Sequence, residues 1–343
     1  MLHRMSVRIK LKNSDRVMWL DGVRACACIM VIVLHVSAQM VVKYKTMEPI
    51  NWHIVNMLDS LVRSCVPLFF MVSGYIFLNN KEIKIKNILR IIYCLAFYSL
   101  LAIVYMLATN KYNPVDRLMG ILEKPVFYHL WFFYSMLCCY VLFSFVKCRL
   151  SNNYIALFLL LAVFLVVNPV TYQAIGLLGV HVKSRFFIDG SFVYLFLYAI
   201  AGCLIGNANT RNLGVIAPFG VFLISSIITA FLVYYTTSET GRFNGAFYNN
   251  NSPFVFMAAV SMYVSIKNYY AEKEVGNIVI FIASLSLPIY GVHALILDVL
   301  ISMGLINETR PVITTVSVAF IVLLASAFVA YFIKKYDKKG LVS

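Results

Sequence analysis

Apolar runs recur along the whole chain, several of them as long as the ~20 residues that an α-helix needs to cross the hydrocarbon core of a bilayer. The composition agrees with this pattern, because 62% of the 343 residues are hydrophobic and only 13% are charged. Soluble domains have roughly half apolar and about a quarter charged residues. The sequence therefore predicts an all-α, polytopic membrane protein built as a bundle of helices.

The apolar windows predict about ten membrane-spanning helices, at 18–42, 54–78, 88–109, 126–146, 155–170, 192–206, 213–235, 252–267, 277–300 and 311–333. We expect a single transmembrane domain over 18–333, a basic N-terminal segment at 1–17 and a basic tail at 334–343. The basic start followed by an apolar run is also typical of a signal peptide. Because Asp21 and Arg24 interrupt that run, we interpret it as the first membrane span.

The net charge of +15 raises the question of nucleic-acid binding. With the N-terminus placed inside, the inner segments hold 18 Lys and Arg residues, both termini and the span-end residues Arg90 and Lys267 included, and the outer segments hold 9. Such a bias is typical of the positive charges that orient membrane proteins, with the richer side in the cytoplasm. The sequence predicts that both termini are cytoplasmic and that nucleic acid is not a partner.

Polar residues inside the first predicted span point to function. The stretch WLDGVRACACIMVIVLHVSAQ (19–39) contains Asp21, Arg24 and His35. A charged side chain at bilayer depth costs roughly 3 kcal/mol on insertion scales, so it normally faces the bundle interior. Eleven residues separate Arg24 from His35, which is about 16 Å of helix rise and three turns. Both side chains therefore lie on one stripe, and Asp21 can pair with Arg24.

Further polar side chains fall at the depth of His35. Asp59 and Arg63 form an i, i+4 pair in the second predicted span, while His129 and His293 lie in the fourth and ninth. A histidine in a span can also simply bond a backbone carbonyl, and the Asp59–Arg63 pair can be structural. At the opposite, inner edge lie Lys84, Lys86 and Arg90, where topogenic positive charges are equally expected.

Four motifs in order resemble the acyltransferase-3 family of membrane proteins. They are WLDGVRACACIMVIVLHVSA with Arg24 and His35, VPLFFMVSGYIFL (66–78) followed by the basic start of the next span, HLWFF (129–133), and Tyr290-x-x-His293. The resemblance runs from about residue 17 to the C-terminus. It implies transfer of an acyl group from cytoplasmic acyl-CoA to a sugar hydroxyl, in a multi-pass protein of the bacterial inner membrane.

Within this family, KPVFYHLWFFYSML, SLPIYGVHALI and the ending LVS are most similar to the branch that O-acetylates enterobacterial common antigen. That resemblance implies acetyl-CoA as co-substrate, with no bound cofactor or metal. It also implies a lipid-linked or polymeric envelope glycan containing N-acetylglucosamine as the acceptor.

The resemblance also implies roles for individual residues. Arg24 and His35 are expected to be essential, with His35 acting as a general base or as a nucleophile that carries the acyl group. Donor contacts are expected from Arg24, Lys84, Lys86 and Arg90. The residues expected to orient His35 or bind the acceptor are Asp59, Arg63, His129, Trp131, Tyr290 and His293.

Two other classes of protein compete with the enzyme. A secondary transporter also carries charged spans and mid-membrane histidines, but the sequence shows no pair of Gly- or Pro-broken spans at matching places in two halves. A non-enzymatic scaffold for glycan assembly would tolerate the loss of His35. The sequence favours the acyltransferase.

Overall fold

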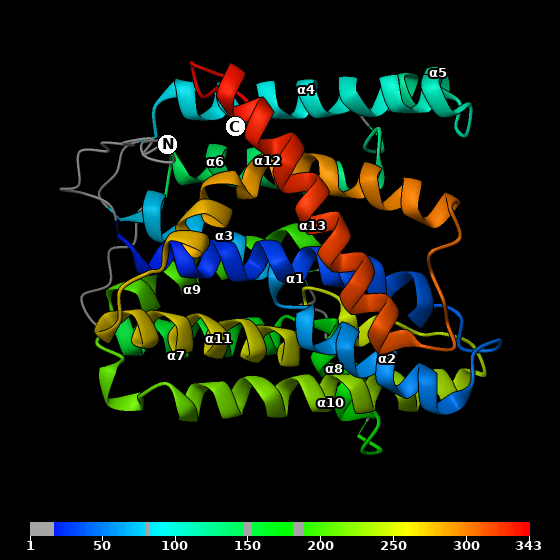
Figure 1. Cartoon of the computed structure of the whole chain (residues 1–343). Helices are drawn as coiled ribbons and strands as arrows, with labels where there is room; N and C mark the ends of the chain where they lie inside the picture. Colours follow the sequence, from blue (N-terminus) through cyan, green and yellow to red (C-terminus); the bar gives the residue numbers. More distant parts are fainter. Residues whose placement is uncertain (1–16, 80–82, 122, 147–152, 181–187, 189) are drawn as a thin grey trace, which may run out of the picture.

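The computed structural model describes residues 17–79, 83–121, 123–146, 153–180, 188 and 190–343. Within these residues the secondary structure is entirely helical, and most of the long helices run in roughly the same direction (Figure 1). The α-helices are α1 (Trp19–Val41), α2 (Pro49–Val62), α3 (Cys65–Leu78), α4 (Ile85–Thr109), α5 (Pro114–Met119), α6 (Trp131–Phe143), α7 (Asn153–Val166), α8 (Pro169–Gly176), α9 (Ser191–Asn207), α10 (Ile216–Thr240), α11 (Pro253–Glu272), α12 (Asn277–Ser302) and α13 (Pro311–Tyr336). Short 3₁₀ turns are η1 (Tyr128–Leu130), η2 (Arg211–Leu213) and η3 (Ala246–Tyr248).

The prediction of a polytopic helical membrane protein is confirmed. Six described helical segments are long and apolar enough to cross a membrane, or seven if the bent pair α7–α8 is one span. Each of the ten predicted segments overlaps a described helix or helix pair, but α6 and α9 are short. The count of ten and the cytoplasmic placement of the termini therefore stay predictions. The predicted basic segment 1–17, apart from Val17, lies outside the described residues.

Two of the predicted spans are broken in the structure. The second consists of α2 and α3, with Arg63 and Ser64 between them. In the fifth, α7 and α8 meet at an angle of 66°. Pro169 occupies the first turn of α8, and the side chain of Asn168 accepts the Val170 N–H, so a new helix begins there instead of the old one continuing.

Helix α1 is the centre of the bundle. It packs against α2, α3, α11, α12 and α13, and Figure 1 shows it between α4 at one edge of the molecule and α10 at the other. Asp21 is almost fully buried, and Arg24 and His35 are half-buried. The polar stripe of α1 thus faces protein rather than lipid, as expected for ionisable groups at this depth.

The closest helix pair of the scaffold is α3 with α9. A side chain at Gly74 would collide with the backbone of Ala199, and one at Gly202 would collide with the backbone of Met71. Small residues at a membrane helix crossing allow the two backbones to approach closely. This crossing fixes α3, which forms one wall of the cavity described below.

Replacing Gly202 with Val should therefore lower the thermal stability of the purified protein, by about 1–3 kcal/mol of unfolding free energy, because overpacking displaces a backbone rather than a side chain. The melting temperature in detergent is the measurement. The matched control is Gly220→Ala in α10, where an added Cβ meets nothing within 4 Å. It should leave the melting temperature unchanged or raise it. Equal melting temperatures for Gly202→Val and wild type would contradict the close-crossing account.

Candidate active site

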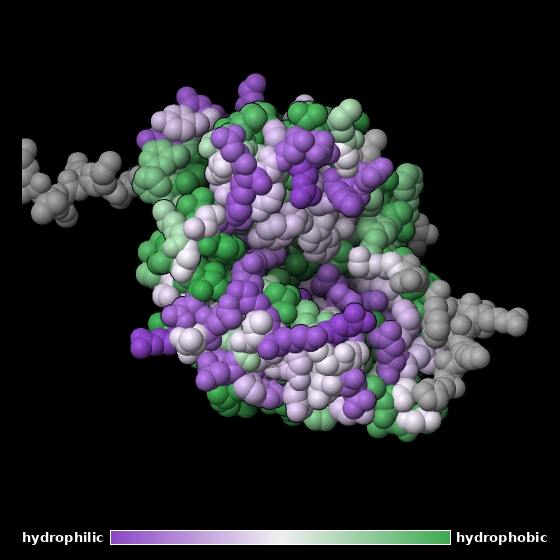
Figure 2. Space-filling model, turned by 90° about the vertical axis from the view of Figure 1, so that its right-hand side faces the viewer, coloured by the Kyte–Doolittle hydropathy of each residue, from purple (hydrophilic) through white to green (hydrophobic). Residues whose placement is uncertain are grey.

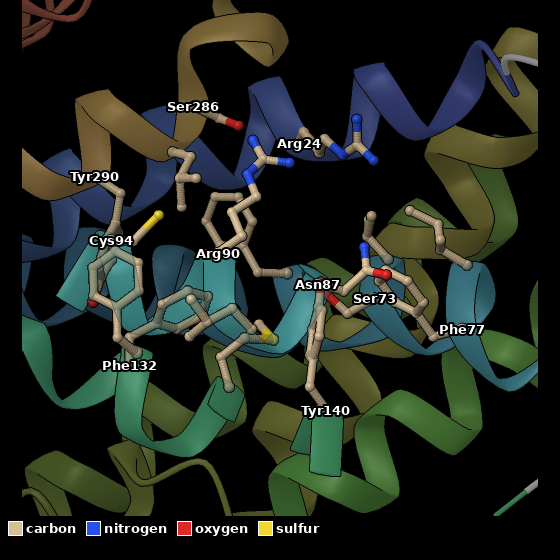
Figure 3. Close-up of a pocket in the computed structure, with 17 residues that line it drawn as sticks. Arg24, Ser73, Phe77, Asn87, Arg90, Cys94, Phe132, Tyr140, Ser286 and Tyr290 are labelled. Atoms are coloured by element: carbon tan, nitrogen blue, oxygen red, sulfur yellow. The ribbon is translucent and has the colours of Figure 1, made fainter. Parts of the chain in front are cut away.

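A cavity of about 200 Å³ lies between α1, α3, α4, α6 and α12. Its mouth is polar and its inner part is aromatic (Figure 3). The lining residues are Arg24, Phe69, Val72, Ser73, Ile76, Phe77, Asn87, Arg90, Ile91, Cys94, Phe132, Phe133, Met136, Tyr140, Ser286, Leu287 and Tyr290.

Two guanidinium groups meet at this cavity. Arg24 reaches it from α1 and Arg90 from α4, and Figure 3 shows both side chains projecting into the same space. Arg24 also lies 3.4 Å from the carboxylate of Asp21, one turn earlier in α1. Arg90 donates a hydrogen bond to the main-chain oxygen of Ser343. Paired guanidinium groups suit the binding of phosphates, because each offers several N–H donors in a fixed plane.

The other two expected donor contacts lie elsewhere. Lys84 and Lys86 are exposed at the start of α4 and do not line the cavity. The backbone N–H of Lys84 donates to Asn87 Oδ1 at 3.1 Å, so this residue begins the helix. The structure therefore brings together two of the four basic residues that the sequence placed at the donor site.

Tyr290 closes the inner end of the cavity. Its ring lies 5.3 Å from that of His293 and 5.7 Å from that of His129, measured between centroids. Its hydroxyl donates to the main-chain oxygen of His129 at 2.5 Å. One face of Tyr290 thus belongs to the cavity with the arginines, and the same ring contacts two of the histidines.

Three histidines from separate elements form a cluster beyond Tyr290. The ring of His35 on α1 lies 5.1 Å from that of His293 on α12, and the ring of His129 in η1 lies 5.3 Å from that of His293. His129 and His293 are fully buried. The sequence predicts that these residues lie at similar depths, and in the structure their rings are neighbours.

The hydrogen bonds of the two buried histidines define their tautomers. His129 Nε2 lies 3.1 Å from the carbonyl oxygen of Gly291, and His293 Nδ1 lies 2.7 Å from that of Tyr290. A carbonyl only accepts, so these two nitrogens carry the protons. His129 Nδ1 and His293 Nε2 are then bare, and neither has a hydrogen-bond partner among the described residues. With its bare nitrogen, His293 can accept a proton from a neighbouring imidazole.

The Asp59–Arg63 pair links α2 to α1 near the cluster. Asp59 Oδ2 accepts from Arg63, and Asp59 Oδ1 accepts from Ser37 Oγ at 2.7 Å. No described hydrogen bond joins Asp59 to His35. Asp59 thus anchors α2 to α1 two residues beyond His35, as in the structural alternative, and its expected role in orienting His35 stays a prediction.

Arg63 is held on its other face by an aromatic ring. Its guanidinium carbon lies 3.8 Å from the centroid of Tyr248, within the distance of a cation–π contact. The Tyr248 hydroxyl donates to Asn56. Arg63 is therefore fixed between the Asp59 carboxylate and the Tyr248 ring.

Two aromatic residues flank the cluster differently. Trp131 is half-buried at the start of α6 and lies outside the cavity lining. Tyr128 is exposed, and its ring lies 5.3 Å from that of His35. No group of three metal-ligating side chains in the described part of the chain is placed to hold an ion.

Sequence reasoning missed several of these residues. Tyr128 and Ser37 reach the site through the fold, and nothing in the spacing signals them. Asp298 in α12 is a different case, because it is an acid within an apolar run, the signal that found Asp59. It accepts hydrogen bonds from Tyr105 at 2.5 Å and Lys111 at 2.8 Å, and so ties the end of α4 to α12.

Comparison with known protein families identifies the class of this helical membrane protein. The acyltransferase-3 family model, described as an acyltransferase domain, matches residues 17–334. The chain belongs to this family. A comparison with curated proteins found no match, and neither did a comparison with solved structures.

The buried ion pair should matter much more for stability than an exposed one. Asp59→Asn removes the charge opposite Arg63 and should cost about 3 kcal/mol of unfolding free energy, the range for breaking a buried pair by removing one partner. The matched control is Glu308→Gln, which breaks the more exposed Lys43–Glu308 pair and should cost at most about 1 kcal/mol. Chemical or thermal unfolding in detergent measures both, and equal effects would contradict the anchoring role of Asp59.

Proposed function

We propose that this protein is an O-acetyltransferase of the bacterial inner membrane. It moves the acetyl group of cytoplasmic acetyl-CoA to a sugar hydroxyl of an envelope glycan. The proposed acceptor is an N-acetylglucosamine residue of enterobacterial common antigen or of its lipid-linked precursor. The observation that carries the proposal is the cavity itself, which begins at Arg24 and Arg90 and ends at Tyr290, in contact with the histidine cluster.

The donor site follows from the charge of coenzyme A. Its phosphates suit the two guanidinium groups, which lie toward the end of the bundle where α1 and α4 begin (Figure 1). The distance along α1 from Arg24 to His35 is about 16 Å, so the pantetheine arm has to carry the thioester inward past the aromatic lining. Tyr290 is then the last side chain between the thioester and the histidines.

In the proposed reaction His35 is the general base. Its bare ring nitrogen takes the proton of the sugar hydroxyl while the hydroxyl oxygen attacks the thioester carbonyl carbon. The C–S bond then breaks, and the leaving thiolate takes the proton from the imidazolium, which restores His35. His293, whose Nε2 has no hydrogen-bond partner among the described residues and whose ring lies 5.1 Å from that of His35, is the proposed acceptor for the N–H of His35.

The acceptor is proposed to enter from the opposite end of the bundle. His35 lies six residues before the end of α1, about 9 Å of helix rise. Figure 2 shows that this end is largely hydrophilic and hollowed near its centre. Exposed charged residues here include Lys43, Lys111 and Arg310. Tyr128 beside His35 offers an exposed ring, an amphipathic surface that suits a sugar.

Loss of His35 should abolish the reaction. In membranes with matched amounts of protein, His35→Ala should lower transfer of labelled acetyl from acetyl-CoA to envelope glycan by at least about 100-fold, the usual contribution of a general base. His53→Ala is the control, because His53 is an exposed histidine of α2 packed against Trp52 and Tyr234. Full transfer by His35→Ala would return His35 to a packing role, and intact acetyl-CoA in wild-type membranes would favour a transporter.

Arg24 should act mainly on donor binding. Arg24→Ala should raise the KM for acetyl-CoA by about tenfold or more, since hydrogen bonds to charged groups contribute roughly 1.5–3 kcal/mol. Lys86→Ala is the comparison, because Lys86 is exposed and outside the cavity, and it should change KM by less than about twofold. Initial rates at varied donor concentration give both values. A larger effect at Lys86 would move the phosphate site from the cavity to the start of α4.

Whether the acetyl group passes directly or through an acyl-imidazole can be tested without the acceptor. Direct transfer predicts that purified protein mixed with labelled acetyl-CoA retains no label after denaturation. Label that stays on wild type and is absent from His35→Ala would establish the covalent route.

A further inference from the structure

The segment after α13 folds back on itself. The carboxylate of Asp337 accepts backbone N–H groups from Leu341 at 3.0 Å, Val342 at 2.7 Å and Ser343 at 2.9 Å. It also accepts the Ser343 hydroxyl at 2.9 Å. One side chain thus organises the whole of 337–343 into a closed turn.

This turn lies along α4. The main-chain oxygens of 341–343 all accept from side chains on one face of that helix. Cys94 Sγ lies 3.6 Å from the Leu341 oxygen, and the Tyr98 hydroxyl donates to the Val342 oxygen at 2.7 Å. Arg90 donates to the Ser343 oxygen. Positions 90, 94 and 98 are spaced by four, so they form one stripe of α4.

The same stripe borders the donor cavity. Arg90 and Cys94 line it, and Tyr98 stacks on Phe133, another lining residue, with ring planes 13° apart. The turn therefore contacts the cavity wall at the point where the phosphates of the donor are proposed to bind.

We propose that the segment 337–343 is a working part of the donor site and that Asp337 is a positioning residue. Through Ser343, Asp337 holds the Arg90 guanidinium at the cavity mouth opposite Arg24, ready for the phosphates of coenzyme A. This inference rests on the proposed function, because it deepens the donor site described there.

The physical basis is pre-organisation. Arg90 is exposed near the start of α4, and ordering a long side chain on binding costs roughly 0.5–1.5 kcal/mol. Its bond to Ser343 restricts the side chain before the donor arrives. A guanidinium carries five N–H donors, so a bond to one oxygen of Ser343 leaves other N–H groups free to bind an anion.

The anchor is stable at neutral pH. Partial burial raises the pKa of Asp337, but the N–H groups of Val342, Leu341 and Ser343 and the Ser343 hydroxyl lower it, and the result is a pKa below the ordinary value of 3.8. A carboxylate with a lowered pKa stabilises the folded turn above its unfolded pKa, and this stabilisation is lost only as the pH falls through the lowered value. Assays near neutral pH therefore measure the closed turn.

The test is calorimetric binding of coenzyme A, and separately of phosphate-free pantetheine, to the full-length protein in detergent. Asp337→Ala, and independently removal of 341–343, should weaken coenzyme A binding roughly two- to tenfold, the range for ordering one side chain, and leave pantetheine binding unchanged. In the Arg90→Ala background the Asp337→Ala effect should vanish, because the two changes act on one contact. Lys335→Ala, a change at an exposed residue of α13 just before this segment, is the control.

Each of the following results would overturn the inference. Tighter coenzyme A binding after Asp337→Ala would make the segment an inhibitory plug, and an equal penalty with and without Arg90 would make it a general structural support. If wild type binds coenzyme A and Asp337→Ala binds it equally well, this inference is overturned and the proposed donor is kept. Wild type that binds no coenzyme A removes the proposed donor as well. Melting temperatures of all variants separate weaker binding from unfolding.

Discussion

The desolvation of charge inside the bundle is the constraint on which the rest of the structure depends. An ionisable side chain in a span has to face protein, a partner or water, and α1 carries Asp21, Arg24 and His35 within 23 residues. The fold meets this demand by surrounding α1 with five other helices. The neighbours then supply the partners, with Asp59 and Ser37 joining α2 to α1 and His293 of α12 contacting His35. The helices packed around α1 therefore shield its charged side chains from lipid and also bring His293 to His35.

The site is divided by one aromatic side chain. On one side of Tyr290 lies a cavity with two arginines, and on the other lie histidines whose protonated nitrogens are fixed by backbone carbonyls. The two sides of Tyr290 are thus distinct in chemistry, and we propose that one binds the donor and the other the acceptor. A single hydroxyl, bonded to the main chain of His129, connects the geometry of one side to that of the other.

Much of this was accessible from the sequence, for physical reasons. The helical period and the rise per residue place Arg24, His35 and His293 at defined depths, and apolar run length identifies the spans. The helix break at Arg63 was missed because it lies within an apolar run without a Gly or Pro signal. The break at Asn168 did have a sequence signal, Pro169, which a search for apolar runs alone passes over. The site roles of Tyr128 and Ser37, and the contact of 337–343 with α4, depend on which helices are neighbours. The spacing of residues within one helix does not show which other helices pack against it.

The position of α4 has a mechanical consequence. The α3 wall of the donor cavity is fixed by a backbone-to-backbone crossing with α9, whereas α4 lies at the edge of the bundle (Figure 1) and many of its residues face outward. Local opening takes least free energy where buried contacts are fewest. We therefore expect the α3 wall of the cavity to move less than the α4 wall, which carries Arg90. Any opening of the cavity is therefore expected to move α4, within the limits set by its bonds to Asp298 and to segment 337–343, rather than α3.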